Sequence, residues 1–422
     1  MNENLQREYD IIVCGGGLSG IAAALAAKRE GKDVLLIERY GFLGGHAANA
    51  LVNPFMSYYE HPTEEEGWPP PKPCIANAGI FLSMVDMMAK YNGIGADLHL
   101  FDEEVMKYVM QMMVINSGVK LLFHTFLADV EVNDGRVTAI VCATKAGLQK
   151  FSAKAFVDCT GDADLTRYAG GEVKIGRDED GLSQPMTMCF RLSHVDPNFD
   201  RQEMLSKFLS AKSRGEIKNP REDILMFSTL DPTVMHFNTT RVLGKSPMDI
   251  KSFTEGECEG REQVYEMHNF LKKEVKGFEN SRLILTAPQL GVRESARIVG
   301  DYVLTVEDIL NLTKFDDSIA RSTYAVDIHN PSGTGTDCRS LPPHTHYTIP
   351  YRSLPVINLT NVIVAGRPIS ATHGAHSAIR ILPVCTCIGE AAGIAAGLFS
   401  GDFHKINAKD IQGILSKNNG LY

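Results

Sequence analysis

The chain has 422 residues, enough for two or three domains, and its 44% hydrophobic and 22% charged contents are those of an ordinary globular protein. The 42 Lys and Arg against 51 Asp and Glu give a formal charge of −9, which argues against nucleic acid or an anionic membrane as the main partner. The nine cysteines contain no C-x-x-C pattern, so neither a disulfide framework nor a zinc or iron–sulfur motif is visible. Residues 1–8 are polar, so no signal peptide is expected and a cytoplasmic location is the default.

The segment 10–38 has the pattern of a nucleotide-binding unit: an apolar strand, a glycine-rich turn, an alanine-rich helix and a second strand. The turn reads G-x-G-x-x-G over residues 15–20 and lies between the two strands, as the dinucleotide fingerprint requires. The helix that follows presents unpaired N–H groups and a positive dipole end to phosphates. A loop that merely turns the chain is the alternative, and the complete flanking context disfavours it.

Each residue of this unit has a separate expected role. Gly15 makes the turn, Gly17 lets the backbone approach a pyrophosphate, and Gly20 packs the helix on the strand. Glu38 ends the second strand, near the spacing where a carboxylate holds a ribose hydroxyl, and Arg39 follows it. The residues predicted to bind the cofactor here are Gly15, Gly17, Leu18, Ser19, Gly20, Glu38 and Arg39. The motif alone leaves FAD and NAD(P) open.

Two further glycines, Gly44 and Gly45, follow the second strand and let the backbone approach a ligand a second time. An extended FAD often requires such a contact, so the pair favours FAD. The segment 53–73 is an irregular, proline-rich loop that holds the only tryptophan; a lid, a subunit contact and a plain solvated loop all remain open. Helical spacing predicts helices over 78–90 and 101–116.

Residues 119–162 have the pattern of a β-meander, with strands starting at 119, 129 and 137 and turn signals between them. A final apolar strand runs into Thr160, Gly161 and Asp162, which predicts a return to the first sheet and another cofactor contact. The alternative is an ordinary strand followed by a turn.

Residues 186–355 contain no nucleotide motif and mix candidate strands, such as 187–192, with charged helices, which predicts a substrate domain inserted into the cofactor domain. Arg293 and Arg297 are four residues apart and would share one face of a helix, where an arginine fork suits a carboxylate. The intervening Glu294 could instead use one of these charges in an internal salt bridge, so substrate binding and structure both remain open.

Two short patterns favour ordinary structure over metal or redox chemistry. His344 and His346 share a strand face, but no acidic or cysteine ligand accompanies them, so polar loop residues are expected and no metal site is predicted. Cys385 and Cys387 are the only close cysteine pair and suit the start of a buried helix better than a redox pair.

A buried strand over 361–364 ends in Gly366 and Arg367, and a loop then leads to a small-residue helix from Pro383. This helix N-terminus would again face the crevice and stabilise charge on a reduced flavin ring. His373, His376 and Arg380 lie in the preceding loop, near the expected reacting ring. The apolar run 381–399 is only marginally long enough to cross a membrane, and its glycine and alanine content favours a buried helix.

Taken together, the motifs resemble the FAD-dependent oxidoreductase family related to the flavin subunit of heterodisulfide reductase and, more distantly, to fumarate-reductase-type flavoproteins. The segments that carry the resemblance are residues 15–20 with 38–39, then 44–45, 160–164, 291–295, 349–354, 364–367, 371–373 and 379–380. The resemblance implies FAD held noncovalently by the first glycine loop, by Gly44 and Gly45, by the turn 160–162 and by Gly366 with Arg367. The chain lacks the cysteine clusters of its larger relatives. A histidyl–flavin bond at His46 is not favoured.

The predicted fold class is α/β: a Rossmann-like FAD-binding domain of the glutathione-reductase type with a β-meander, over 1–185 and 355–422, plus an inserted α+β substrate domain over 186–354. The predicted enzyme transfers a hydride between flavin N5 and a small polar or anionic substrate. Arg293 and Arg380 would bind that substrate, and His373 would move the proton. The electron acceptor is left unknown, and a homo-oligomer is left open. The alternatives are an electron-transfer subunit docking to an iron–sulfur partner and a nicotinamide enzyme without flavin.

Overall fold

The computed structural model describes residues 7–67 and 73–422. The main sheet contains β1 (Glu8–Cys14), β2 (Val34–Ile37), β3 (Lys120–Leu122), β4 (Phe126–Asn133), β5 (Arg136–Thr144), β6 (Gly147–Asp158) and β17 (Val362–Val364). A second sheet contains β8 (Phe190–Ser193), β9 (Met226–Ser228), β10 (Met235–Phe237) and β11 (Arg282–Thr286). The remaining strands pair two by two: β7 (Val173–Ile175) with β12 (Ala296–Ile298), β13 (Ser318–Ser322) with β16 (Tyr347–Pro350), and β14 (Val326–His329) with β15 (Thr336–Arg339).

Most of the helices begin after a polar or glycine N-cap, whereas two of them begin after Ala163 and Ile381. Those of the first third are α1 (Leu18–Arg29), α2 (His46–Asn49), α3 (Ile80–Lys90) and α4 (Glu103–Ser117). The middle of the chain forms α5 (Asp164–Tyr168), α6 (Arg201–Ser213), α7 (Ile250–Glu274) and α8 (Val306–Leu310). The C-terminal helices are α9 (His373–Ile379), α10 (Leu382–Leu398) and α11 (Ala408–Lys417).

The main sheet has a parallel half and an antiparallel half that share β6. Strands β3, β2, β1, β6 and β17 are parallel neighbours, whereas β4, β5 and the first half of β6 form an antiparallel ladder. The prediction of a strand starting at 119 as part of the meander is wrong: β3 pairs in parallel with β2, with Lys120 opposite Leu35. The helices α3 and α4 between β2 and β3 make this connection a crossover, which a parallel strand pair requires.

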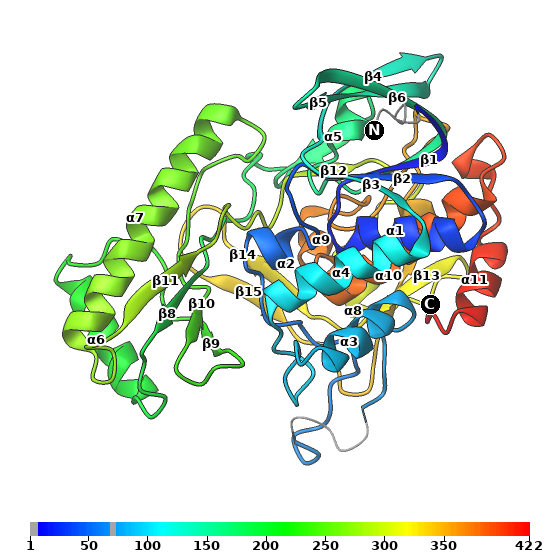
Figure 1. Ribbon diagram of the computed structural model, residues 1–422. Helices are drawn as coiled ribbons and strands as arrows, with labels where there is room; N and C mark the ends of the chain where they lie inside the picture. The colour runs from blue at the N-terminus through cyan, green and yellow to red at the C-terminus, as the bar shows by residue number, and fades with distance from the viewer. Residues whose placement is uncertain (1–6, 68–72) are drawn as a thin grey trace.

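Helices α1 and α10 pack against each other beneath the parallel strands (Figure 1). Both are rich in small residues because their backbones approach closely: a Cβ on Gly389 would lie 2.2 Å from the Ser19 carbonyl oxygen, and one on Gly393 would lie 2.2 Å from that of Ala23. Within the described residues no single helix is long and apolar enough to cross a membrane; only α9 and α10 taken together, bent by 94°, pass that test. Residues 383–397 of α10 are buried.

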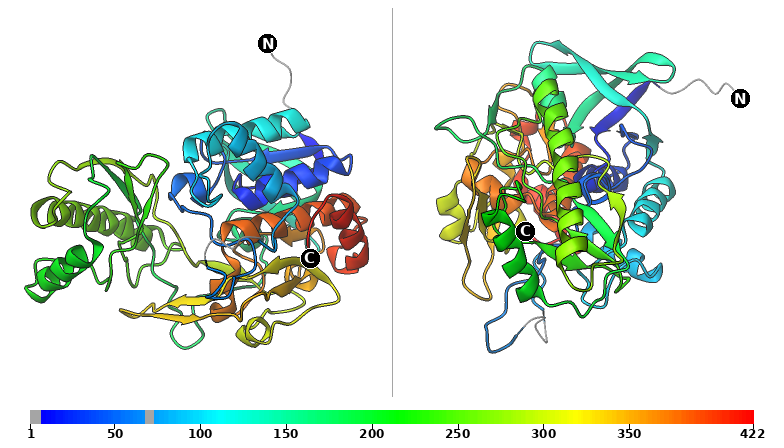
Figure 2. Two further views of the ribbon diagram at one scale, coloured as in Figure 1. Left: turned by 90° about the horizontal axis from the view of Figure 1, so that it is seen from below. Right: turned by 90° about the vertical axis from the view of Figure 1, so that its left-hand side faces the viewer.

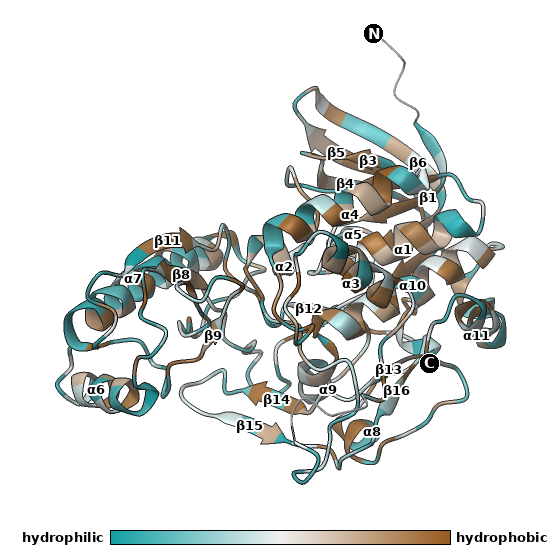
Figure 3. Cartoon of the chain, turned by 60° about the horizontal axis from the view of Figure 1, so that its bottom comes forward, coloured by the Kyte–Doolittle hydropathy of each residue, from teal (hydrophilic) through white to brown (hydrophobic). Residues whose placement is uncertain are grey.

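The inserted segment forms a smaller lobe beside the main one, built from α6, α7 and strands β8 to β11 (Figures 1 and 2). Its helix α7 alternates polar and apolar residues, while α1 and α10 are mostly apolar (Figure 3). The lobe has its own hydrophobic cluster, which spans residues 186–292 and includes Leu51. Residues 304–354 instead belong to the main cluster. The predicted domain 186–354 therefore combines a separate lobe with a segment that packs on the cofactor domain.

Candidate cofactor and substrate site

A cavity of about 530 Å³ lies between the carboxyl ends of the parallel strands and the smaller lobe. This is where open α/β sheets bind their ligands. The predicted cofactor residues that line it are Gly15, Gly17, Leu18, Ser19, Glu38, Arg39, Gly44, Gly45, Thr160, Gly161, Asp162 and Arg367. His46, Arg293 and Arg380 line the same cavity, whereas Gly20, Gly366 and His373 do not.

The first glycine loop has almost no room for side chains on its inner side. A Cβ on Gly15, whose φ is +104°, would lie 2.3 Å from the Cys159 carbonyl oxygen, and one on Gly20 would lie 1.8 Å from that of Gly15. Gly17 is open, since its Cβ would meet only Gly45 at 3.7 Å. The Gly44 N–H donates to the Gly16 carbonyl at 2.9 Å, so the second glycine pair is packed directly on the first loop. A Cβ on Gly45 would lie 2.7 Å from Gly17 Cα, so this close packing requires glycine at position 45.

The carboxylate of Glu38 is buried and lies beside the loop. One oxygen accepts from the Gly16 N–H at 2.7 Å and the other from the Tyr40 N–H at 2.8 Å. Burial raises the pKa of Glu38, and these two backbone donors oppose the rise. Glu38 lines the cavity and shapes the glycine loop as well, a role that the spacing argument does not reveal.

The turn after β6 is held by two carboxylates. Buried Asp158 accepts from the N–H and hydroxyl of Thr160 and of Thr166, at 2.8 to 3.1 Å. Asp162 forms an ion pair of 2.7 Å with Arg367, which also donates to the carbonyls of Gly161 and Val292. Arg367, which follows β17, therefore links that strand to the turn 160–162 and to Val292, at the end of the smaller lobe.

The other end of the cavity is lined by arginines. Arg293 donates to the Pro185 carbonyl and the Thr187 hydroxyl, both at 2.6 Å, and Arg221 donates to Asp223 at 2.6 Å. Arg380 lies 3.6 Å from the Asp327 carboxylate, and its Nη1 is buried with no hydrogen-bond partner among the described residues. Burial and the neighbouring cations Arg380 and Arg221 lower the pKa of Arg293. These three guanidinium groups concentrate positive charge at this end of the cavity.

Three polar residues for which the sequence predicted no role at this site line the same end: Tyr324, Asp327 and His329. Asp327 and His329 lie two apart on β14, so both point to the cavity side of the hairpin. The only signal in the sequence is the alternation Val326-Asp327-Ile328-His329. Burial raises the pKa of Asp327, but the hydrogen bond from His329 and the charge of Arg380 outweigh it and lower that pKa below its ordinary value.

The prediction that Arg293 and Arg297 share a helix face is wrong. Residues 291–295 are irregular and Arg297 lies in strand β12, where it pairs with the fully buried Glu294, so only Arg293 reaches the cavity. Glu294 also accepts from His373 Nδ1 at 2.8 Å. His373 lines a separate surface groove on the other side of the hairpin β14–β15, together with Arg177 and Thr372.

The other predicted loop features lie away from the cavity or outside the described residues. His344 pairs with Glu66 and His346 with Glu60, each at 2.8 Å, and no group of three or more metal-ligating side chains occurs within 7–67 and 73–422. Of the loop 53–73, residues 53, 54 and 56 line the cavity. Trp68 and the prolines at 69–71 fall outside the described residues, so a role as a lid stays a prediction.

The parallel sheet, the glycine loop on a helix N-terminus and a cavity continuous from Glu38 to Arg380 define a Rossmann-type dinucleotide-binding protein. The open face of Gly17 and the two helix N-termini at the cavity fit an extended dinucleotide. The chain belongs to the family of FAD-dependent oxidoreductases, because the sequence model of that family matches residues 10–415. FAD is therefore the cofactor, and the protein is an oxidoreductase.

Among the known proteins that are similar to this chain, two sequences and one solved structure are described here. The tRNA uridine 5-carboxymethylaminomethyl modification enzyme MnmG of Streptococcus gordonii is 30% identical over 190 residues, which cover 42% of this chain and 26% of that enzyme. Thiamine thiazole synthase of Methanococcus vannielii is 27% identical over 165 residues, 36% of this chain and 56% of that protein. The chain thus matches only about a quarter of the first relative's length.

The solved structure is a geranylgeranyl bacteriochlorophyll reductase-like protein of Thermoplasma acidophilum. It superposes with a TM-score of 0.50 and 13% identity, over 97% of this chain and 84% of its own. The likeness concerns the fold alone.

Proposed function

We propose that this oxidoreductase acts on a small anionic substrate, bound at the end of the cavity where Arg221, Arg293 and Arg380 converge. The observation that carries the proposal is the charge of this end: three guanidinium groups have only two carboxylates beside them, Asp327 in the cavity lining and the exposed Asp223, which pairs with Arg221. The chain as a whole has a formal charge of −9, so this excess of positive charge is local. Buried cations without enough protein partners favour an anionic ligand.

The cofactor fits the opposite end and the middle of the same cavity. The glycine loop and Glu38 would hold the adenosine and pyrophosphate, and the start of α10, where Ile381, Leu382 and Cys385 line the cavity, would hold the flavin ring. When bound, FAD supplies two-electron hydride chemistry at N5. The chain's own arginines would orient the substrate against that ring, and the helix dipole would stabilise negative charge on it.

An anaerobic flavin-reduction screen tests the substrate class. Hydroxy acids, other carboxylates, phosphorylated compounds and uncharged sugars are added to the FAD-loaded protein, and bleaching of the flavin absorbance is followed. We expect anionic compounds to bleach it, and Arg380→Met to raise the half-saturating concentration about 10- to 100-fold, since a charged hydrogen bond contributes roughly 1.5–3 kcal/mol.

The matched control is Arg352→Met, because Arg352 pairs with Asp317 at 3.0 Å and is half exposed, away from the cavity. Bleaching by uncharged sugars that is equally fast in the wild type and Arg380→Met would contradict an anionic substrate. A flavin that no small molecule bleaches, but that a reduced iron–sulfur protein does, would favour an electron-transfer subunit instead.

A further inference from the structure

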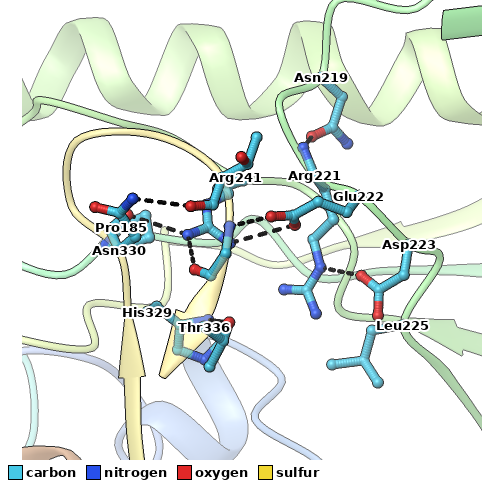
Figure 4. A network of polar contacts seen from close by, with 12 residues as sticks. Pro185, Asn219, Arg221, Glu222, Asp223, Leu225, Arg241, His329, Asn330 and Thr336 are labelled. Atoms are coloured by element: carbon cyan, nitrogen blue, oxygen red, sulfur yellow. Dashed lines mark hydrogen bonds and ion pairs between the residues drawn. The ribbon is translucent and has the colours of Figure 1, made fainter. Parts of the chain in front are cut away.

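Three cavity-lining side chains of the hairpin β14–β15 form a line of polar contacts. The Thr336 hydroxyl lies 3.2 Å from His329 Nδ1, and His329 Nε2 lies 3.4 Å from Asp327 Oδ2. The ladder register places His329 directly opposite Thr336, and the strand period places Asp327 on the same face. A hydroxyl, an imidazole and a carboxylate are thus aligned beside the arginine end of the cavity, and Figure 4 shows His329 and Thr336 in contact.

The neighbours of Asp327 determine where the protons lie. Its carboxylate accepts from the Tyr324 hydroxyl at 3.3 Å and faces Arg380 at 3.6 Å, so it is ionised and can only accept. His329 Nε2 must therefore carry the hydrogen that points to Asp327. The lone pair of Nδ1 is left for the Thr336 hydroxyl, which lies 3.2 Å from it.

We propose that Thr336, His329 and Asp327 form a relay that moves the substrate proton; this rests on the proposed function. In the direction of substrate oxidation, the carbon gives up a hydride to the FAD, and the substrate oxygen gives up a proton to the Thr336 hydroxyl. That hydroxyl passes its own proton to His329 Nδ1, and Asp327 stabilises the imidazolium that forms. In the reverse direction the same groups return the proton.

The pKa of His329 depends on the charged groups around it, and substrate binding would change their effect. Burial and the cation Arg293 lower the pKa of His329 to about 3, with a smaller effect of Arg380 in the same direction and an opposing effect of Asp327. The empty site therefore keeps the imidazole neutral. An anion bound at the arginines offsets their charge and raises this pKa, so the imidazole becomes a better proton acceptor when the substrate is present.

The smaller lobe holds the hairpin in place. The buried Arg241 donates through Nη2 to the carbonyls of Asn330 at 3.0 Å and Gly335 at 2.9 Å, and Glu222 accepts from the Gly335 N–H (Figure 4). These contacts close the turn that connects His329 to Thr336. Arg241 is thus a positioning residue: it keeps the two strands in register without touching the cavity lining.

His373 cannot take this role from its place in the structure. The hairpin separates it from the cavity, and its Nδ1 is engaged by buried Glu294. His329→Gln and His373→Gln therefore distinguish the two assignments. A matched control is His404→Gln, because His404 forms a similar carboxylate pair with Asp301, 2.8 Å apart, in a different surface groove.

The first test does not depend on finding the substrate. In the FAD-loaded protein labelled with ¹⁵N-histidine, the signals missing in His329→Gln identify His329. We expect a neutral imidazole at pH 7 with the hydrogen on Nε2, and a different tautomer population in Asp327→Asn. An imidazolium at pH 7, or hydrogen on Nδ1 in the wild type, would overturn the relay.

The second test uses the anaerobic bleaching reaction with an anionic compound found by the screen. We expect His329→Gln to slow bleaching by about 10²–10⁴-fold. Thr336→Val should slow it less, and Thr336→Ser should retain the wild-type rate.

The pH profile gives an independent readout. The activity should fall at acid pH, and the pKa of this fall should be lower in kcat/KM, which reports the free enzyme, than in kcat, which reports the substrate complex. His329→Gln should remove this fall, while His404→Gln leaves it. Removal of the fall by His373→Gln and its retention in His329→Gln would overturn the proposal.

Discussion

Glu38 Oε2 accepts a hydrogen bond from the Gly16 N–H at 2.7 Å, so the carboxylate at the end of β2 stabilises the loop that the cofactor must contact. Both of its oxygens are occupied by backbone N–H groups, the second by that of Tyr40. Glu38→Gln supplies only one acceptor and turns an amide NH₂ toward the other N–H. An unpaired buried donor costs about 1–3 kcal/mol. We expect the affinity for FAD to be about 5- to 150-fold weaker, measured by fluorescence titration of the apoprotein.

Exposed Glu65→Gln is the control for this change and should retain wild-type affinity. An FAD affinity of Glu38→Gln equal to that of the wild type would mean that the loop keeps its shape without this carboxylate.

The buried pair of Arg367 and Asp162 should be far more costly to break than an exposed pair. Arg367→Met leaves the Asp162 carboxylate without its cation and the carbonyls of Gly161 and Val292 without their donor. Breaking a buried pair from one side costs about 3–5 kcal/mol. Arg352→Met, which breaks the exposed pair with Asp317, should cost under about 1 kcal/mol. Urea unfolding of both variants measures the difference, and equal losses would contradict it.

The glycines of α10 are expected to be irreplaceable for steric reasons. A Cβ on Gly393 would lie 2.2 Å from the Ala23 carbonyl oxygen, which belongs to the backbone of α1 and cannot rotate away. Gly393→Ala should therefore destabilise the protein by about 1–3 kcal/mol through overpacking. Gly413→Ala in α11 meets nothing within 4 Å and should stabilise the helix by up to about 1 kcal/mol. Thermal unfolding of the two variants should shift in opposite directions.

Asp164 at the start of α5 should make stability depend on pH. Burial, followed by the nearby carboxylates Asp162 and Asp158, raises its pKa from 3.8 to about 7. The folded protein therefore holds a proton on Asp164 that the unfolded chain releases between these values. The stabilisation that comes from this raised pKa is fully present below about pH 4 and is lost as the pH rises to about 7.

The variant Asp164→Asn stays neutral and should lose less stability over this range. Its advantage over the wild type should grow with pH, to an upper limit of about 4 kcal/mol. Denaturant unfolding at pH 4, 5.5 and 7 measures this difference, and a constant offset between the two proteins would contradict a raised pKa.

Local pattern was sufficient for the cofactor half of the molecule. The glycine loop, the strands on either side of it and the small-residue helix α10 are short-range features, and their chemistry depends on neighbours within about twenty residues. For Gly44 and Gly45 the sequence predicted only a second close approach to a ligand, and their packing against the first loop is visible only in the structure. The family resemblance extended this reading to FAD and to oxidoreductase activity.

The substrate half could not be read in the same way, because its residues come from distant segments. The spacing of Arg293 and Arg297 predicts a helix, but Arg293 lies in an irregular segment and Arg297 in strand β12. Only the Arg293 side chain therefore lines the cavity. Similarly, β3 was assigned to the meander because its own residues do not reveal which strand it pairs with.

The sequence by itself determined that the protein binds a dinucleotide, since the fingerprint is local and its chemistry is carried by the backbone; the residues that contact the cofactor stay a prediction. The tertiary structure alone decided which polar side chains share the cavity with that cofactor. Arg380 comes from the loop before α10, Arg221 from the smaller lobe, and His329 from a hairpin between them. Their convergence depends on how the two lobes pack, and no spacing along the chain records it.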